Sequence, residues 1–496
     1  MRYWKLGVDA LVLLAGSLAS SHSAMSQTPA PFVVQPQLLQ QLRSAQPFQD
    51  NNGQMPQPGV YNGPFFKLNH AWPTASLPPL THAPWQEAIH NGPLTPANAP
   101  AYAAALKAAV TTNGRSLLIH YDTWDAAKAG WYNEPWLGSI RESIHGTYQG
   151  SEFDTTNFPD VGAPFSTRVL TYYDTRAAAS LNRFWGASAM RPTLETANAQ
   201  FDEGSLIVKV ASFASMDLQK PRDWWAPLKG AQVWDVFIDP TDNKAPPQVW
   251  PSFVAQFDII VKDTQSSPRT GWVFMTLVYD ADVPGDFWDK MVPLGVQWGN
   301  DPEATSADVP LKENWINVAT PGYARATLGW NDRLSGPNDG ASNFIAYNGQ
   351  ATKTPVGNSS CMSCHSTSQW NPTTHRMDPA SFLLPSFPRP ASQGGGAPFE
   401  TCGPNGTPDP KGSWICSPAP GSPAWMKWFQ DRKGDHAMDS DSFATDFDEV
   451  FAFKSLGAWW AATGSADQAE VLMLMGRGLT GRRFNQYSGA PLPDRN

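Results

Sequence analysis

The chain has 496 residues, of which 41% are apolar, enough for a large core and for two or three domains. Its formal net charge is −9, and no basic stretch is dense enough to bind nucleic acid or an anionic membrane surface, so we expect neither partner. Only 16% of the residues are charged, whereas the chain has 46 Pro, 39 Gly and 22 Trp. This composition predicts many turns and short strands with aromatic packing.

The first 24 residues have the pattern of a secretory signal peptide. Arg2 and Lys5 give a positive start, residues 11–19 are apolar, and small residues lead up to Ala24. The apolar run is too short to span a membrane, and no later segment is a candidate for a membrane span. The sequence therefore predicts cleavage near Ala24 and a periplasmic or secreted protein.

Residues 25–115 are predicted to form an irregular arm, because they are rich in Pro, Gln, Asn and Ser and their apolar pattern is irregular. Within this arm, residues 96–110 predict a short helix that is ended by the T-N-G at 112–114. The next run, S-L-L-I-H-Y at 116–121, predicts a strand with His120 as a core histidine.

Residues 116–380 are predicted to form the main domain. Runs of β-branched, aromatic and alternating residues predict strands at 168–173, 205–211, 233–239, 257–262 and 272–279. The last two runs predict an antiparallel pair joined by a polar turn, and a helix is expected at 175–185. The predicted fold class is therefore α+β, with a β-rich antiparallel sheet and flanking helices.

The pentapeptide Cys361-Met362-Ser363-Cys364-His365 has the C-x-x-C-H pattern of a c-type haem attachment site. The two thiols can form thioether bonds with the porphyrin, and His365 can be the proximal ligand of the iron. A redox dithiol or half of a zinc site would need only the two cysteines. The adjacent histidine and the lack of a second C-x-x-C argue against both, and a chance disulfide pair is the remaining alternative. The sequence predicts one covalent haem c.

Residues 381–496 are predicted to form a C-terminal extension. Cys402 and Cys416 flank a Gly/Pro-rich loop, and in an oxidising compartment we expect them to form a structural disulfide. Two helices are predicted beyond this loop, at about 446–462 and at 466–476.

Several segments, taken in order, resemble the cytochrome P-460 and cytochrome c′-β family. They are Y-Y-D at 172–174, F-D-E-G-S-L-I-V-K at 201–209, V-K-D at 261–263, G-W-V-F at 271–274, and the C-x-x-C-H motif. The resemblance covers residues 168–368, and the gap between Trp272 and Cys361 is longer than in the family. It implies a mostly antiparallel sheet with flanking helices and with the haem bound at one side.

The resemblance also implies a role for Lys209. In the P-460 branch, the lysine at the matching position is bonded to a meso carbon of the porphyrin. A physical argument that does not use this likeness also singles out Lys209. It interrupts a predicted strand that is apolar on both faces, so its ammonium group must reach solvent along the chain, pair with a carboxylate or contact a buried group such as haem. A lysine on an edge strand that reaches solvent is the alternative. We expect the Lys209 amine to lie against the porphyrin edge with a lowered pKa.

The second axial position of the iron would decide the chemistry. Met438 lies in a polar loop, D-H-A-M-D-S, and is the candidate for a distal ligand, whereas His145 has no specific signal. Two functions are therefore predicted. One is a redox cytochrome that exchanges electrons with a partner protein. The other is a P-460-like haem enzyme or gas-binding protein that acts on hydroxylamine or nitric oxide.

Overall fold

The computed structural model describes residues 46–75, 77–155, 157–241, 245–339, 342–343, 345–348, 350–373 and 415–463. The predicted signal peptide, Cys402 and the predicted helix at 466–476 lie outside these residues. In the part of the chain that is described, no helix is long and apolar enough to cross a membrane.

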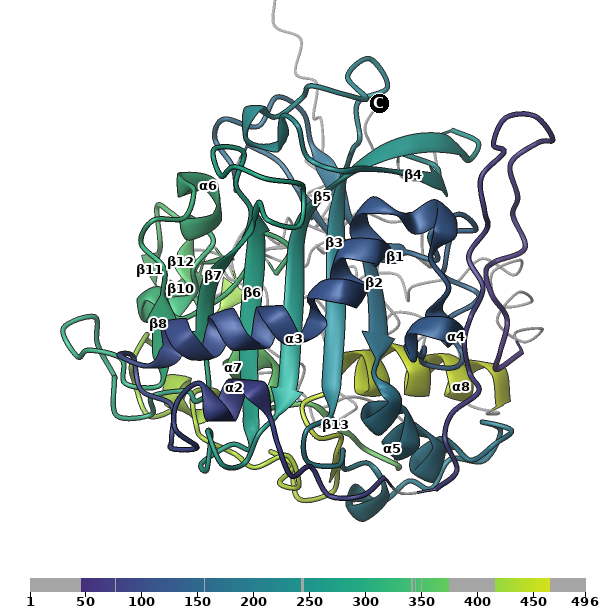
Figure 1. Cartoon of the computed structure of the whole chain (residues 1–496). Coiled ribbons are helices and arrows are strands. Elements are labelled where there is room, and N and C mark those ends of the chain that lie inside the picture. Colours follow the sequence, from purple (N-terminus) through teal and green to yellow (C-terminus); the bar gives the residue numbers. More distant parts are fainter. Residues whose placement is uncertain are drawn as a thin grey trace, which may run out of the picture. The chain divides into compact units, whose positions relative to one another are not determined.

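The main element is an eight-stranded antiparallel sheet, so the expectation of a β-rich α+β fold is confirmed (Figure 1). Its strands are β1 (Tyr148–Phe153), β2 (Phe165–Tyr173), β3 (Leu206–Ser215), β4 (Val233–Ile238), β5 (Gln248–Lys262), β6 (Trp272–Tyr279), β7 (Met291–Gln297) and β8 (Asn314–Ile316). The order across the sheet is β1-β2-β3-β5-β6-β7-β8, and β4 pairs with β5. The predicted pairing of residues 257–262 with 272–279 is confirmed, because Lys262 lies opposite Trp272 in the register of β5 and β6.

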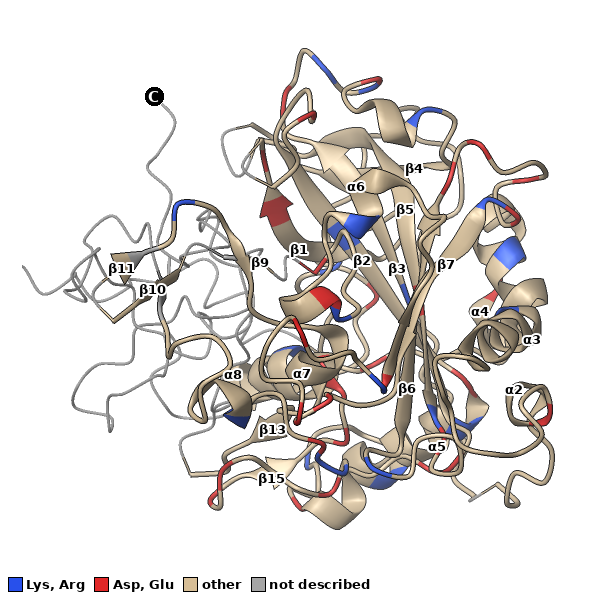
Figure 2. Ribbon diagram, turned by 90° about the vertical axis from the view of Figure 1, so that its left-hand side faces the viewer, with Lys and Arg blue, Asp and Glu red and all other residues tan. Residues whose placement is uncertain are grey.

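The three central strands place alternate rows of side chains on opposite faces of the sheet. One row joins Val208, Ile259 and Met275, which belong to the main hydrophobic core together with residues of helix α3 (Ala99–Ile119). The next row joins Lys209, Asp258 and Thr276, which line a cavity on the opposite face. Figure 2 shows α3 on one side of the sheet and α7 (Cys361–His365) on the other.

Helix α3 corrects three predictions. It continues to Ile119, so residues 116–121 do not form a strand, and His120 is an exposed residue at the helix end rather than a core histidine. Gly114 does not end the helix. It lies inside the helix where the Trp288 ring packs closely against it, and a Cβ at this position would stand 2.5 Å from that ring. Leu117 and Leu118 extend the buried stripe of the helix by a further turn, and this packing outweighs the local preference of the segment for a strand.

The other helices and small strands surround the sheet. The remaining α-helices are α2 (Pro84–Glu87), α4 (Ala126–Ala129), α5 (Thr175–Trp185), α6 (Gly322–Arg325) and α8 (Leu456–Thr463). Single turns of 3-10 helix occupy Tyr121–Thr123, Thr196–Asn198, Ala226–Leu228, Trp330–Asp332 and Trp425–Lys427. The short strands are β9 (Ser342–Asn343), β10 (Ile345–Tyr347), β11 (Gln350–Ala351), β12 (Val356–Gly357), β13 (Gln369–Trp370), β14 (Ile415–Cys416) and β15 (Phe443–Ala444).

The predicted helix at 446–462 begins later than expected. A π-helix spans Val450–Ser455 and continues directly into α8, whereas residues 446–449 precede the helix. Asp446 and Phe447 both have positive φ angles, 50° and 68°, which a helix does not allow.

Candidate haem-attachment site

The C-x-x-C-H motif forms the single helical turn α7. Its start is fixed by a capping box, in which the Ser360 side chain accepts from the Ser363 backbone N–H while the Ser363 hydroxyl accepts from the Ser360 N–H. In such a turn, residues three and four apart lie on neighbouring positions, so Cys364 and His365 both lie next to Cys361. Both cysteines carry thiols and are not joined in a disulfide.

His365 is fixed by one backbone contact. Its Nδ1 lies 2.6 Å from the carbonyl oxygen of Phe447, a geometry in which the Nδ1 proton is donated and Nε2 keeps its lone pair. Burial lowers the pKa of His365 to about 4, so the imidazole is neutral at pH 7. A neutral imidazole with one nitrogen held by a carbonyl is the arrangement that metal-binding histidines use.

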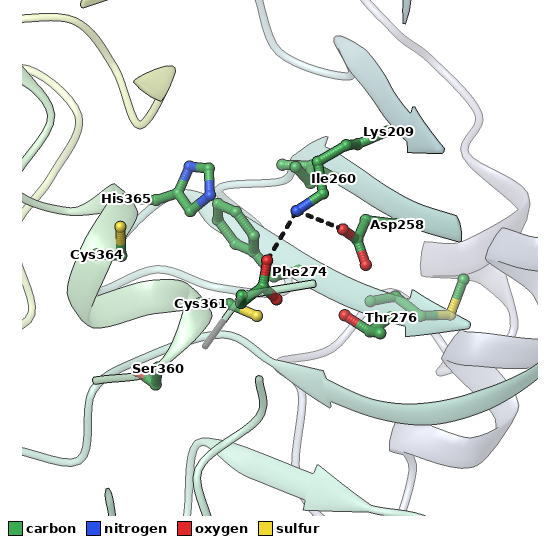
Figure 3. Close-up of a pocket in the computed structure, with 11 residues that line it drawn as sticks. Lys209, Asp258, Ile260, Phe274, Thr276, Ser360, Cys361, Cys364 and His365 are labelled. Carbon is green, nitrogen blue, oxygen red and sulfur yellow. Dashed lines mark hydrogen bonds and ion pairs between the residues drawn. The ribbon is translucent and has the colours of Figure 1, made fainter. Parts of the chain in front are cut away.

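A cavity joins α7 to the polar face of the sheet (Figure 3). Its lining residues from the sheet are Lys209, Asp258, Ile260, Phe274, Met275 and Thr276. Those from the connecting segments and from α7 are Asp339, Ser360, Cys361, Cys364 and His365. The volume is about 30 Å³, which is room for roughly two water molecules.

Lys209 extends into this cavity from the central strand β3. Its Nζ lies 2.8 Å from an oxygen of Asp258, which is its direct neighbour on β5, and 3.0 Å from an oxygen of Asp339. Figure 3 shows the Lys209 amine turned toward the Asp258 carboxylate, with a dashed line for their ion pair. Because β3 lies between β2 and β5, the alternative of an edge-strand lysine is wrong.

The protonation of Lys209 differs from what we expected. Burial by itself lowers the pKa of the amine, but the carboxylates of Asp258 and Asp339 outweigh burial and raise the pKa well above its usual value. The lysine is therefore an ammonium group clamped by two carboxylates, rather than a neutral amine. Burial by itself raises the pKa of Asp339, but the charge and the hydrogen bond of Lys209 outweigh burial and lower that pKa below its usual value.

The environment of Cys361 argues against a redox dithiol. Burial raises the pKa of its thiol well above the ordinary value, and the charges of Asp339 and Asp258 raise it further. A redox-active cysteine needs the opposite shift, because the thiolate is the reactive form. In the described part of the chain, no three His, Cys, Asp or Glu side chains are grouped as metal ligands.

The structure places the other predicted site residues elsewhere. Met438 packs against the cluster of Trp330, Trp425 and Phe429 and does not line the cavity. Cys416 is in β14, but Cys402 lies outside the described residues, so the predicted disulfide stays a prediction. His145 is buried against the rings of Tyr121 and Trp234, and its Nδ1 contacts the Asp235 carbonyl oxygen.

Sequence reasoning missed Asp258, Asp339 and Phe447. Asp258 could have been found, since pairing residues 205–211 with 257–262 in the register observed puts it opposite Lys209. Asp339 lies in a loop and Phe447 acts through its backbone, and neither gives a signal in the sequence.

The donor set fits a haem c group, since two thiols on one helical turn adjoin a neutral imidazole whose Nδ1 is already engaged. The cavity is smaller than a porphyrin, so attachment requires the side chains around it to move apart. Comparisons with protein-family models, with curated proteins and with solved structures found no match. The resemblance to the cytochrome P-460 and cytochrome c′-β family therefore stays a prediction.

Proposed function

We propose that this chain is an exported, periplasmic monohaem c-type cytochrome with a redox role. The observation that carries the proposal is the C-x-x-C-H turn itself: both cysteines are thiols, and the histidine is neutral and oriented by the Phe447 carbonyl. When bound, the haem supplies one-electron redox chemistry and an iron that can bind small ligands. Its physiological electron partner would be another protein.

In this proposal each residue of the motif has a separate task. Cys361 and Cys364 would hold the macrocycle through thioether bonds, and His365 would offer its Nε2 to the iron. The Phe447 carbonyl keeps the proton on Nδ1, which leaves Nε2 as the only nitrogen with a lone pair.

The test is a mass measurement together with a pyridine haemochrome spectrum on the full-length protein matured in a periplasm. We expect the mass of the polypeptide plus one haem. The double variant Cys361→Ala/Cys364→Ala should carry no covalent haem, and His365→Ala should mature poorly. His120→Ala is the matched control, because His120 is exposed at the end of α3 and should load haem normally. A matured wild-type protein with the mass of the bare polypeptide would contradict the proposal.

A second candidate is a P-460-like haem enzyme or gas-binding protein that acts on hydroxylamine or nitric oxide. Two observations favour it. Met438, the methionine predicted as a distal ligand, packs against Trp330, Trp425 and Phe429 and does not line the cavity beside the motif. The cavity beside the motif instead has Lys209 and two carboxylates, which can bind or exchange protons with a small polar ligand.

Absorption spectra of the ferric and ferrous protein, with and without nitric oxide, separate the two candidates. Fast spectral changes on adding nitric oxide would favour the second one, since they require an open axial position. A low-spin six-coordinate spectrum that nitric oxide does not change would remove it and leave electron transfer.

A further inference from the structure

The segment that carries the Phe447 carbonyl has an unusual backbone. Asp446 and Phe447 are consecutive non-glycine residues with positive φ angles, and the π-helix Val450–Ser455 begins three residues later. Such conformations persist only where the surrounding structure determines them, and they are common at functional sites. The contacts that hold this segment are therefore informative.

The Asp446 carboxylate is completely buried and has three donors. The Trp272 indole N–H donates to Oδ1 at 2.8 Å, the Phe201 backbone N–H donates to Oδ2 at 2.7 Å, and the Lys262 ammonium forms an ion pair with Oδ2. Lys262 and Trp272 lie opposite each other where β5 ends and β6 begins. Gly434 makes room for the carboxylate, because a Cβ at that position would overlap Asp446.

Phe447, the residue after Asp446, connects the anchored carboxylate to His365. The Phe447 ring packs against Trp272 and Phe274, and Phe274 in turn packs against the His365 ring at 4.7 Å between ring centres. On the other side, the Ser368 hydroxyl donates to the Asp448 carbonyl oxygen at 2.8 Å. The carbonyl that accepts from His365 is thus fixed from both ends of its segment.

We propose that Asp446 is a positioning residue for His365: through Lys262 and Trp272 it holds the Phe447 carbonyl against Nδ1 and so sets the tautomer and the basicity of the imidazole. A hydrogen bond from the second nitrogen of a ligating histidine fixes the ring and raises its basicity as a ligand. The inference rests on the proposed function insofar as the nitrogen that is made basic is the one that binds iron. The orientation of His365 itself does not depend on haem.

The first experiment uses the full chain without haem, and ¹⁵N chemical shifts of the His365 imidazole are measured by NMR. We expect a single Nδ1–H tautomer in the wild type and a mixture of tautomers in Asp446→Asn, because the amide cannot accept all three donors. Trp272→Phe keeps the carboxylate and removes one donor, so it gives a smaller shift in the same direction and still tests the proposal if Asp446→Asn does not fold. Glu142→Gln is the matched control: Glu142 is also a buried carboxylate that accepts backbone N–H groups, but it orders residues 144–147 and β4.

The second experiment uses the haem-loaded protein and measures the midpoint potential and the iron–histidine stretching frequency. Both Asp446→Asn and Trp272→Phe should raise the potential and lower the frequency, whereas Glu142→Gln should change neither. The proposal is overturned if folded variants at positions 446 and 272 keep the wild-type tautomer, or if the wild type itself has its proton on Nε2. If the tautomer results hold but matured protein contains no haem, the proposed function fails and the role of Asp446 in orienting His365 remains.

Discussion

The two faces of the main sheet are built from the same three strands but have opposite chemistry. Toward α3, Val208, Ile259 and Met275 are part of one large apolar core. Toward α7, the neighbouring row of Lys209, Asp258 and Thr276 is polar and charged, yet it is also buried or nearly so.

The apolar row stabilises the fold, whereas the charged row costs free energy to bury. Burying apolar side chains is favourable wherever they fit. Burying a charged row is costly and becomes tolerable only when each charge has a partner, as Lys209 has in Asp258 and Asp339. The polar face is therefore where we look for function, and the following predictions test the distinction.

The largest expected effect is on the polar face. Lys209→Leu should lower the free energy of unfolding at pH 7 by about 3–5 kcal/mol, because it leaves two buried carboxylates without their cation. The loss should shrink at pH 5, where the carboxylates can take up protons. Urea unfolding at the two pH values measures both effects. A triple variant, Lys209→Leu with Asp258→Asn and Asp339→Asn, should recover most of the stability, and an equally unstable triple variant would refute the charge argument.

A core substitution on the apolar face should lower the free energy of unfolding by a similar amount without affecting the cavity beside α7. Leu106 is fully buried on α3, so Leu106→Ala should lower the free energy of unfolding by about 3 kcal/mol, within the range for buried leucines. Unlike Lys209→Leu, it should leave the alkylation rates of Cys361 and Cys364 unchanged in the haem-free protein. A changed rate would show that the two faces are coupled.

A buried histidine on the apolar side gives a pH test. Burial lowers the pKa of His145 to about 3, so below pH 6.5 the unfolded chain takes up a proton that the folded protein refuses. Its contribution to stability should therefore fall by about 1.4 kcal/mol for each pH unit from 6.5 down toward 3. His145→Phe keeps the stacking on Tyr121 and Trp234 and should reduce the acid dependence of thermal unfolding at pH 5 to 7, leaving the part that comes from His365, whose pKa burial also lowers. An unchanged slope would assign the acid sensitivity to other groups.

The smallest expected effect concerns the Thr276 hydroxyl, which lies beside Cys361. A hydrogen bond from Thr276 lowers the pKa of the Cys361 thiol against the larger effect of burial, so Thr276→Val should raise that pKa further. Stability should change by less than about 1 kcal/mol. The pH dependence of alkylation in the haem-free protein measures the shift, and a faster reaction at neutral pH would contradict it.

Much of the sheet could be predicted because each of its strands is marked by a local run of β-branched, aromatic or alternating residues. The runs 168–173, 233–239 and 272–279 fall within or almost within observed strands. The helix predicted at 175–185 matches α5, and the structure shows that the Asp174 side chain caps its start and Gly186 follows its end. The segment 116–121 was mispredicted because its residues favour a strand, while the helix is stabilised by distant packing on Trp288.

The site was predictable only where chemistry is contiguous in the sequence. The C-x-x-C-H motif needs no structure to be recognised, and Lys209 stood out because it interrupts an apolar strand. Asp339 and Asp446 lie in loops, and the lysines with which they pair, Lys209 and Lys262, are 130 and 184 residues away along the chain. No local pattern encodes such contacts, so only the fold brings them to the site.

The order of the strands in the sheet has a consequence for the timing of assembly. From β1 to β8 the neighbours follow the chain almost consecutively, so the sheet can form from pairs that are close in sequence. Besides its contacts with the sheet, α7 is held by the Phe447 carbonyl, which is 82 residues beyond His365, so this contact must close a long loop. We therefore expect the sheet to form first and the C-terminal segment to dock last. Under the proposed function, haem would be attached to the two thiols during that interval, before the C-terminal segment covers them.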